Sequence, residues 1–341
     1  MPQRLAQISN WLQNDLQLSK YDIKPASSDA SFRRYFRITA CEGKFAPYNA
    51  KKLIIMDAPP FREDVKPYLR IAKMLAELGL NVPIVLAENL ELGFLLLSDL
   101  GSIQYLSILN KNNVARLYGD ALSALLKMQT SGTRAPGSLP EYDRALLQRE
   151  LEIFREWYLQ KHLGLRLSQA QEKLINDSFE LLIQSALEQP KVFVHRDFHS
   201  RNLMQTDVNN PGVLDFQDAV IGPVTYDLVS LLKDCYISWP REQLETWALQ
   251  HKQSLEQSQV IDKMDDQKFL RWFDLMGAQR HLKATGIFAR LDIRDGKTDY
   301  LKDIPRTLSY VADVSGRYSE LHALNELLLS IMPSLATSKN Q

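Results

Sequence analysis

Long apolar segments, cysteine and net charge are all scarce in this sequence. No run approaches the length of a bilayer span, and the first sixteen residues, MPQRLAQISNWLQNDL, lack the apolar core of a secretory signal. The two cysteines, Cys41 and Cys235, are far apart and form neither a C-x-x-C motif nor a metal-binding pattern. We therefore expect a soluble cytoplasmic protein whose cysteines are buried thiols in a reducing compartment.

The charges balance, with 41 basic and 41 acidic side chains. A formal net charge of zero argues against nucleic acid or an anionic membrane as partner, although it leaves room for a local basic pocket for phosphates. The length of 341 residues suggests about two domains, and 45% hydrophobic residues is ordinary for a globular protein.

Periodicity divides the chain into a small mixed lobe and a larger helical lobe. An amphipathic helix over 3–18 precedes strands that end near 38, 56, 86 and 97, with a helix over 65–80 among them. From 99 onward the pattern is mostly helical, over 114–128, 141–163, 168–188, 226–239, 241–256, 266–291 and 316–332, with a loop over 130–140. We predict lobes over 1–98 and 99–341, an α+β architecture.

The stretch from 192 to 227 interrupts the helices with two short apolar strands. The first leads into His195, Asp197 and Asn202, spaced H-x-D-x-x-x-x-N. The second, after a turn rich in Asn, Pro and Gly, delivers Asp215 and Phe216. One carboxylate for an incoming hydroxyl, with an amide and a second carboxylate for Mg²⁺, suits phosphoryl transfer. The competing interpretation is that these are ordinary turn residues, in which Asn and Asp cap loops.

These motifs resemble the aminoglycoside-phosphotransferase and choline-kinase branch of the protein-kinase-like fold. HRDFHSRN matches the catalytic loop, and LDFQ stands where protein kinases have Asp-Phe-Gly. His199 within the loop and Gln217 in place of glycine are typical of the small-molecule kinases, and there is no Ala-Pro-Glu segment. The resemblance implies a two-lobed protein-kinase-like fold over almost the whole chain, with ATP and Mg²⁺ as cofactors.

Three further segments, SSDASFRRYFRI, LIIMDAPP and FDLMGAQRHLKATGIFARL, are similar to the bacterial anomeric kinases of amino sugars. That resemblance implies phosphorylation of N-acetylmuramate or N-acetylglucosamine at C1, in peptidoglycan recycling. The alternatives are a kinase of choline, homoserine or an aminoglycoside, and a pseudokinase that binds nucleotide without turnover. We expect a monomer.

The resemblance also assigns roles within the catalytic loop. It makes Asp197 the base that accepts the hydroxyl proton, and Asn202 and Asp215 the Mg²⁺ ligands. His195 becomes a structural histidine that orients the loop behind the metal-binding Asp. Asp227 becomes a structural acceptor of backbone N–H groups from the loop. Arg196 and His199 remain open between substrate contact and a solvent-facing position.

In such a fold the adenine lies against the boundary between the lobes. The Asp99 carbonyl and the Leu100 N–H would face the purine edge, with Leu97 and Leu214 as apolar walls. The usual lysine of the third strand is missing, as is a glycine-rich phosphate loop. Arg33, Arg34 and Arg37 are the nearest substitute cations, because guanidinium suits bidentate phosphate contact; a solvated basic turn is the alternative.

The acceptor pocket is expected in the C-terminal lobe, near residues 279–283. The lactyl carboxylate of an acidic amino sugar needs a cation, and Arg280 or Lys283 could supply it. For Lys283 we favour an exposed position on a charged helix face. Asp218 could meet sugar hydroxyls, and Tyr236 and Trp239 are aromatic side chains that stack on sugars or pack in a core.

Overall fold

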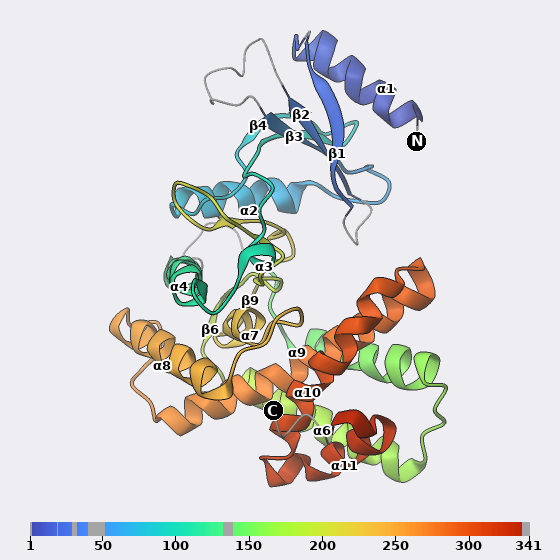
Figure 1. Ribbon diagram of the computed structural model, residues 1–341, viewed down its shortest axis with the longest axis vertical. Coiled ribbons are helices and arrows are strands. Elements are labelled where there is room, and N and C mark those ends of the chain that lie inside the picture. The colour runs from blue at the N-terminus through green and yellow to red at the C-terminus, as the bar shows by residue number, and fades with distance from the viewer. Residues whose placement is uncertain (1, 19, 29–32, 40–51, 132–138, 336–341) are drawn as a thin grey trace. The chain divides into compact units, whose positions relative to one another are not determined.

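The computed structural model describes the chain except for residues 1, 19, 29–32, 40–51, 132–138 and 336–341 (Figure 1). The chain forms two compact units. The first unit comprises Met1–Ile103 and Met204–Asp218, and the second comprises Gln104–Leu203 and Ala219–Gln341. The boundary proposed from sequence, between residues 98 and 99, lies close to the Ile103/Gln104 division. The sequence did not predict that 204–218 returns to the first unit.

A five-stranded antiparallel sheet forms the centre of the first unit, in the order β1-β2-β3-β5-β4. The strands are β1 (Asp22–Ser28), β2 (Arg34–Thr39), β3 (Lys52–Asp57), β4 (Val85–Asn89) and β5 (Phe94–Ser98). Strand β1 was not predicted, because it holds Pro25 and few strand-forming residues. Among the described strands it pairs with β2 alone, and such an edge position tolerates proline.

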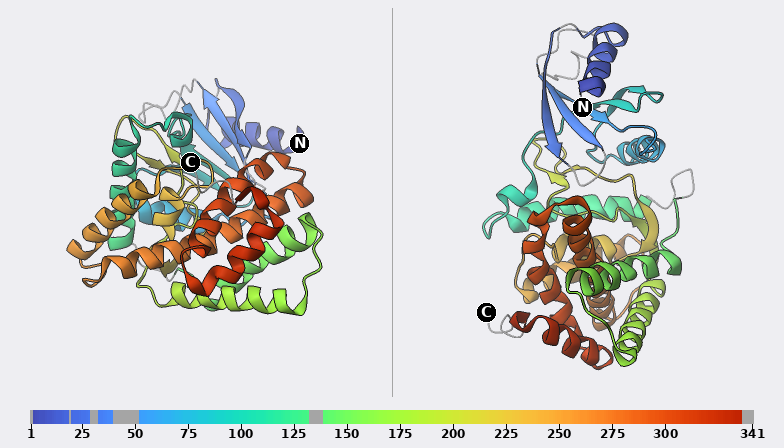
Figure 2. Two further views of the ribbon diagram at one scale, coloured as in Figure 1. Left: turned by 60° about the horizontal axis from the view of Figure 1, so that its bottom comes forward. Right: turned by 90° about the vertical axis from the view of Figure 1, so that its right-hand side faces the viewer.

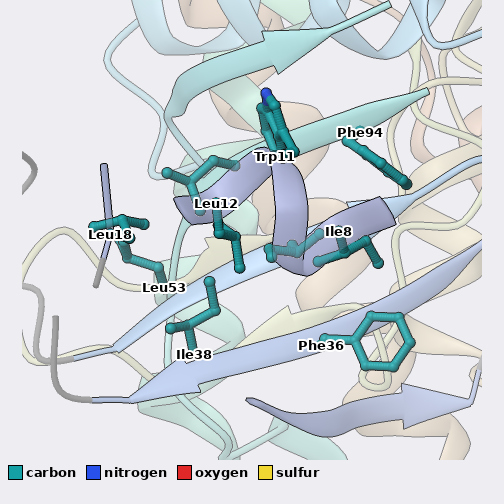
Figure 3. Close-up of a cluster of buried hydrophobic side chains, with 10 residues drawn as sticks. Ile8, Trp11, Leu12, Leu18, Phe36, Ile38, Leu53 and Phe94 are labelled. Carbon is teal, nitrogen blue, oxygen red and sulfur yellow. The ribbon is translucent and has the colours of Figure 1, made fainter. Parts of the chain in front are cut away.

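Helix α1 (Pro2–Asn10) and the π-helical turn η1 (Trp11–Asp15) cover one face of this sheet (Figure 3). Their apolar side chains form one buried cluster with strand residues, comprising Ile8, Trp11, Leu12, Leu18, Phe36, Ile38, Leu53, Ile55, Phe94 and Leu96. Side chains alternate along a strand, so Ile54 and Leu97, which pair with each other, point to the opposite face. The sequence predicted this amphipathic helix.

The segment 204–218 joins the first unit through the loop after helix α2 (Lys66–Glu77). Its hairpin consists of β7 (Leu203–Met204) and β8 (Gly212–Val213), and Val213 N donates to Asn81 O at 2.7 Å. The Phe216 ring lies 4.9 Å from the buried Tyr68 ring of α2. These contacts hold the strand end that carries Asp215.

Helix α9 (Asp266–Asp295) is the central helix of the second unit (Figure 2). Asp265 caps its first turn, and Gly296, in the left-handed conformation, ends it. The helices around it are α5 (Arg144–Ile153), η4 (Phe154–His162), α6 (Gln169–Leu187), α7 (Tyr226–Leu232), α8 (Arg241–Gln257) and α10 (Ile304–Ser315). Gly286 allows α9 to approach the end of α5 closely, because a Cβ at residue 286 would collide with the Ile153 carbonyl.

The remaining elements of the second unit include α3 (Tyr105–Ile108), α4 (Val114–Ser131), η5 (Thr298–Asp303), η6 (Ser319–Leu321) and α11 (His322–Ile331). Helix α10 was not predicted, and the helix expected over 226–239 ends at Leu232. Most of the loop predicted over 130–140 lies outside the described residues. No helix of the described part is long and apolar enough to cross a membrane.

A two-stranded ladder leads into the loop that carries the predicted catalytic residues. Strand β6 (Lys191–Val194) pairs antiparallel with β9 (Val220–Pro223). Val192, Phe193 and Val194 are buried, as the apolar run predicted. The mixed first unit and the mainly helical second unit confirm the predicted α+β class.

Candidate active site

The catalytic loop begins where strand β6 ends, and the first turn of helix α7 holds it. The Asp227 carboxylate accepts hydrogen bonds from His195 N at 2.6 Å and from Arg196 N at 3.0 Å. Burial raises the pKa of Asp227 to about 7, against the lowering effect of these two hydrogen bonds. Asp227 thus makes the contacts predicted for it. Arg196 has a φ of 78°, an unusual conformation for a residue with a side chain, and these bonds help to hold it.

The His195 imidazole is fully buried beside the loop. Its Nδ1 accepts a hydrogen bond from Asp197 N at 3.3 Å, and its ring meets Phe198 edge-on at 5.7 Å between centroids. The backbone of Asp197 is therefore tied to a side chain with a fixed orientation. This geometry fits the orienting role that the sequence suggested for His195.

Asp197 is partly exposed and surrounded by basic groups of the second unit. Burial raises the pKa of its carboxyl, but attraction from Lys283, His199, Arg280 and Arg196 outweighs burial, so the pKa is lowered. The carboxylate is therefore ionised at neutral pH. An ionised carboxylate that keeps some exposure can accept a proton from a bound hydroxyl.

The amide of Asn202 is oriented by the loop itself, since Nδ2 donates to the Asp197 carbonyl at 3.0 Å. That orientation makes Oδ1 the amide atom suited to a cation, so Asn202 fits the predicted metal role. Asp215 also fits, because its side chain is 27% exposed. Its Oδ1 accepts from Gln217 Nε2 at 2.8 Å. Mg²⁺ commonly binds one or two such protein oxygens together with phosphate oxygens and water.

Glu150 of α5 is a buried carboxylate that sequence reasoning missed. It pairs with Arg196 of the catalytic loop and, at 2.8 Å, with Lys283 Nζ of α9, and the Tyr142 hydroxyl also donates to it. Burial raises its pKa, yet the two cations lower it further, so the pKa is lowered overall. A signal was available, because Glu150 lies between Leu147 and Leu151 on the apolar face of its helix.

Two sequence predictions change because of Glu150. Lys283 is not on an exposed helix face: it is 9% exposed, and its Nζ also donates to the Tyr226 hydroxyl at 3.0 Å. Arg196, left open between substrate and solvent, directs its guanidinium to Glu150 instead. Both cations are held within the second unit by a carboxylate, as buried charges must be.

Arg280 and His199 lie close enough to Asp197 for a positive charge on either to lower the pKa of its carboxyl. Arg280 is 6% exposed, and its Nη1 donates to the Cys235 sulfur at 3.6 Å. The His199 ring meets the Tyr236 ring edge-on at 5.5 Å. Burial lowers the pKa of His199, which Asp234 and Asp197 oppose, and the imidazole is neutral at physiological pH.

The aromatic candidates are already in contact with protein groups. The Arg201 guanidinium lies 3.6 Å from the centre of the Tyr236 ring. Trp239 donates to the Tyr118 hydroxyl at 3.1 Å and packs edge-on against that ring. Asp218 is exposed at the end of the first unit and accepts from Gln217 at 3.2 Å, so its predicted sugar contact stays a prediction.

Arg33, Arg34 and Arg37, the candidate phosphate-binding cations, have different environments. Arg34 lies opposite Asp57 on β3, and its guanidinium pairs with that fully buried carboxylate, which Arg4 of α1 also contacts. Arg34 therefore points to the face covered by α1, whereas Leu97 points to the other face. This pairing with Asp57 argues against a nucleotide contact for Arg34, and the nucleotide role stays a prediction.

Arg37 and Arg33 contact carboxylates other than Asp57. Arg37 makes a forked contact with Asp99, at 2.6 and 3.0 Å, and donates to the Gly101 carbonyl. The Asp99 side chain is thus structural, and the roles of its carbonyl and of the Leu100 N–H stay predictions. Arg33 Nη2 lies 3.9 Å from Asp215 Oδ1, and its Nε lies 4.0 Å from Glu63. Arg33 is therefore the arginine beside the predicted metal ligand.

The fold and the loop at Asp197 are those of an enzyme that transfers phosphoryl groups to small molecules. Residues 22–266, more than half of the chain, match the model of the phosphotransferase enzyme family, and the chain belongs to this family. Choline kinase from Cryptosporidium parvum superimposes with a TM-score of 0.63 at 12% identity, covering 95% of this chain and 99% of that one. The ADP-bound aminoglycoside phosphotransferase APH(2'')-Ib gives 0.57 at 15% identity, covering 91% and 98%. These likenesses confirm the protein-kinase-like fold.

Curated relatives match over nearly the full length. A Pseudomonas putida protein is 47% identical over 96% of both chains, and its name is N-acetylmuramate/N-acetylglucosamine kinase. Proteins of the same name from Pseudomonas aeruginosa and Neisseria meningitidis are 45% and 42% identical, over 96–97% of each chain. The predicted resemblance, and with it a small-molecule kinase, is confirmed.

Proposed function

We propose that this enzyme transfers the γ-phosphoryl group of ATP to the C1 hydroxyl of N-acetylmuramate or N-acetylglucosamine. The observation that carries this proposal is the name shared by relatives that are 42–47% identical over almost the whole chain. Among the alternatives, a kinase of choline or of an aminoglycoside has support only from fold-level likeness at 12–16% identity. A pseudokinase has no need of the ionised base and metal-type oxygens that Asp197, Asn202 and Asp215 provide.

In the proposed reaction, Asp197 accepts the proton of the sugar hydroxyl while the hydroxyl oxygen forms its bond to the γ-phosphorus. The bond from that phosphorus to the β–γ bridging oxygen breaks, and ADP leaves. Asn202 and Asp215 would hold Mg²⁺, which neutralises charge on the phosphates when bound. His195 and Asp227 keep the loop backbone in the conformation that presents Asp197.

The acceptor is tested by measuring ATP turnover with N-acetylmuramate, N-acetylglucosamine, choline, homoserine and kanamycin. We expect turnover with the amino sugars and little with the others. The product should have lost its reducing end, since phosphorylation at C1 blocks ring opening. A product that still reduces would contradict the C1 assignment, and preferential turnover of choline or kanamycin would contradict the sugar assignment.

Arg33 is the proposed substitute for the lysine missing from the third strand. We expect Arg33→Ala to raise the KM for ATP by about tenfold, because one charge-assisted phosphate contact is lost. Arg34→Ala is the matched control: it removes a neighbouring guanidinium that Asp57 already holds, so it should lower the melting temperature and leave the KM for ATP unchanged. An unchanged KM for ATP in the Arg33 variant would remove this assignment.

The wider setting follows from the proposed substrate. An amino sugar released from the cell wall is a substrate for recycling, so we propose that the enzyme acts in peptidoglycan recycling in the cytoplasm. We also propose that it acts as a monomer.

A further inference from the structure

Helix α9 carries four polar side chains that are buried in the second unit, Gln279, Arg280, His281 and Lys283. Buried cations normally have a carboxylate partner, because an uncompensated charge in the interior is costly. The buried lysines of the described residues follow this rule. Lys233 pairs with Asp274, Lys252 with Glu256 and Asp266, and Lys283 with Glu150.

Arg280 departs from the rule. It is 6% exposed, and its polar contact is the donation from Nη1 to the Cys235 sulfur at 3.6 Å. Burial raises the pKa of the Cys235 thiol, so the sulfur is neutral and provides no countercharge. In the part of the chain that the structure describes, no carboxylate lies within ion-pair distance of Arg280. The guanidinium therefore has donors in a fixed fork without the anionic acceptor that this geometry suits.

The nearby carboxylates are committed to other groups or tasks. Asp234 accepts from Ser200 N at 3.0 Å, from the Ser200 hydroxyl at 2.5 Å and from Tyr236 N at 2.9 Å. Asp197 is the proposed base, whose charge acts on Arg280 from beyond ion-pair distance. A bound anion close to the base is therefore the partner that Arg280 lacks.

We propose that Arg280 binds the carboxylate of an acidic amino sugar and so determines the preference for N-acetylmuramate over N-acetylglucosamine. This inference rests on the proposed function, in which both sugars are acceptors. The two sugars differ at O3, where N-acetylmuramate carries a lactyl ether with a carboxylate and N-acetylglucosamine has a neutral hydroxyl. A forked guanidinium can form two parallel hydrogen bonds with the carboxylate and only a weaker contact with the hydroxyl.

A rival role for Arg280 acts on Asp197 alone. If Arg280 only positioned or stabilised the base, both sugars would depend on it equally, because both use the same base. If it binds the lactyl group, the loss should be confined to the acidic sugar. The ratio of kcat/KM for the two sugars separates these roles, since each variant then carries its own control for folding and for chemistry.

The variants are Arg280→Gln, which removes the charge, and Arg280→Lys, which keeps the charge and removes the fork. We expect Arg280→Gln to lower kcat/KM for N-acetylmuramate by roughly 30-fold or more, mainly through KM, while N-acetylglucosamine changes by less than about threefold. Arg280→Lys should lie between wild type and Arg280→Gln. Arg271→Gln, on the same helix but at the partly exposed pair with Glu320, is the control that should leave both sugars unchanged.

A substrate variant tests the same contact in the unmodified enzyme. The methyl ester of N-acetylmuramate removes the charge, so wild type should lose about the same factor with the ester as Arg280→Gln loses with the acid. The loss from combining the two should be much smaller than the product of the separate losses, as in a double-mutant cycle.

Two results would overturn the inference: an unchanged ratio of kcat/KM for the two sugars in Arg280→Gln, or full activity of wild type on the ester. The wild-type reaction also separates this inference from the proposed function. If wild type phosphorylates neither amino sugar, the proposed function fails and the inference falls with it. If wild type uses both sugars and their ratio ignores Arg280, only the inference fails.

Discussion

Replacing Asp197 with Asn should lower kcat for sugar phosphorylation by about 10²–10⁴-fold, with little change in the KM for ATP. The amide has nearly the shape of the carboxylate but cannot accept the hydroxyl proton. The loop should keep its conformation, because the bonds that hold it use the backbone of residues 195–197 and the side chains of Asp227 and His195. The measurement is steady-state ATP turnover with each amino sugar.

Asp177→Asn is the matched control for this variant. Asp177 lies on the exposed face of α6, where it pairs with Lys173 four residues earlier. Such exposed pairs contribute roughly 0–1 kcal/mol, so neither activity nor stability should change noticeably. If Asp197→Asn retained wild-type turnover while its melting temperature was unchanged, Asp197 would not be the base.

Replacing Glu150 with Ala should reduce the free energy of unfolding by about 3–5 kcal/mol, a large part of the stability of an ordinary domain. The substitution leaves Lys283, which is buried, and Arg196, which is partly buried, without their shared carboxylate. Glu150→Gln should cost less, because the amide oxygen can still accept hydrogen bonds. Urea unfolding monitored by circular dichroism measures the change.

Glu180→Gln is the control for the Glu150 variants. Glu180 pairs with Arg144, but both side chains are about half exposed, so removing its charge should change the free energy of unfolding far less than removing the Glu150 carboxylate. If Glu150→Ala were as stable as Glu180→Gln, the buried pairs would contribute no more than surface pairs. The same result would weaken the view that Glu150 holds the catalytic loop through Arg196.

The sequence identified the loop between β6 and β7 because that information is local. The spacing of His195, Asp197 and Asn202, and the strand before them, identify the loop without knowledge of distant contacts. The side chain of Asp227 is 32 positions from the backbone of His195 that it holds, so the sequence alone gave its role only by resemblance. Arg34, Phe36 and Ile38 are spaced two residues apart, so they share one face of their strand. This spacing could have placed Arg34 on the apolar face.

Partners distant in sequence could not be predicted from periodicity. Nothing local indicates that Arg4 contacts Asp57, or that Lys283 contacts Glu150, because each pairing depends on how whole elements pack. The signal that did exist was an ionisable residue within an apolar stripe. Glu150 shows it among Leu147 and Leu151, and Arg4 shows it four residues before Ile8. Such a residue indicates that a buried partner exists but does not identify that partner.

The pairing of Arg4 with Asp57 shows that residues outside the family match contribute to the first unit. The family match covers 22–266, yet Arg4, Ile8 and Trp11 precede it, and most of α9 follows it. A chain trimmed to the matched range would expose the sheet face beneath α1 and leave Asp57 with one of its two guanidinium partners. It would also discard Arg280 and Lys283. The region by which the family is recognised is therefore smaller than the part of the chain whose side chains cover the sheet face and form the centre of the second unit.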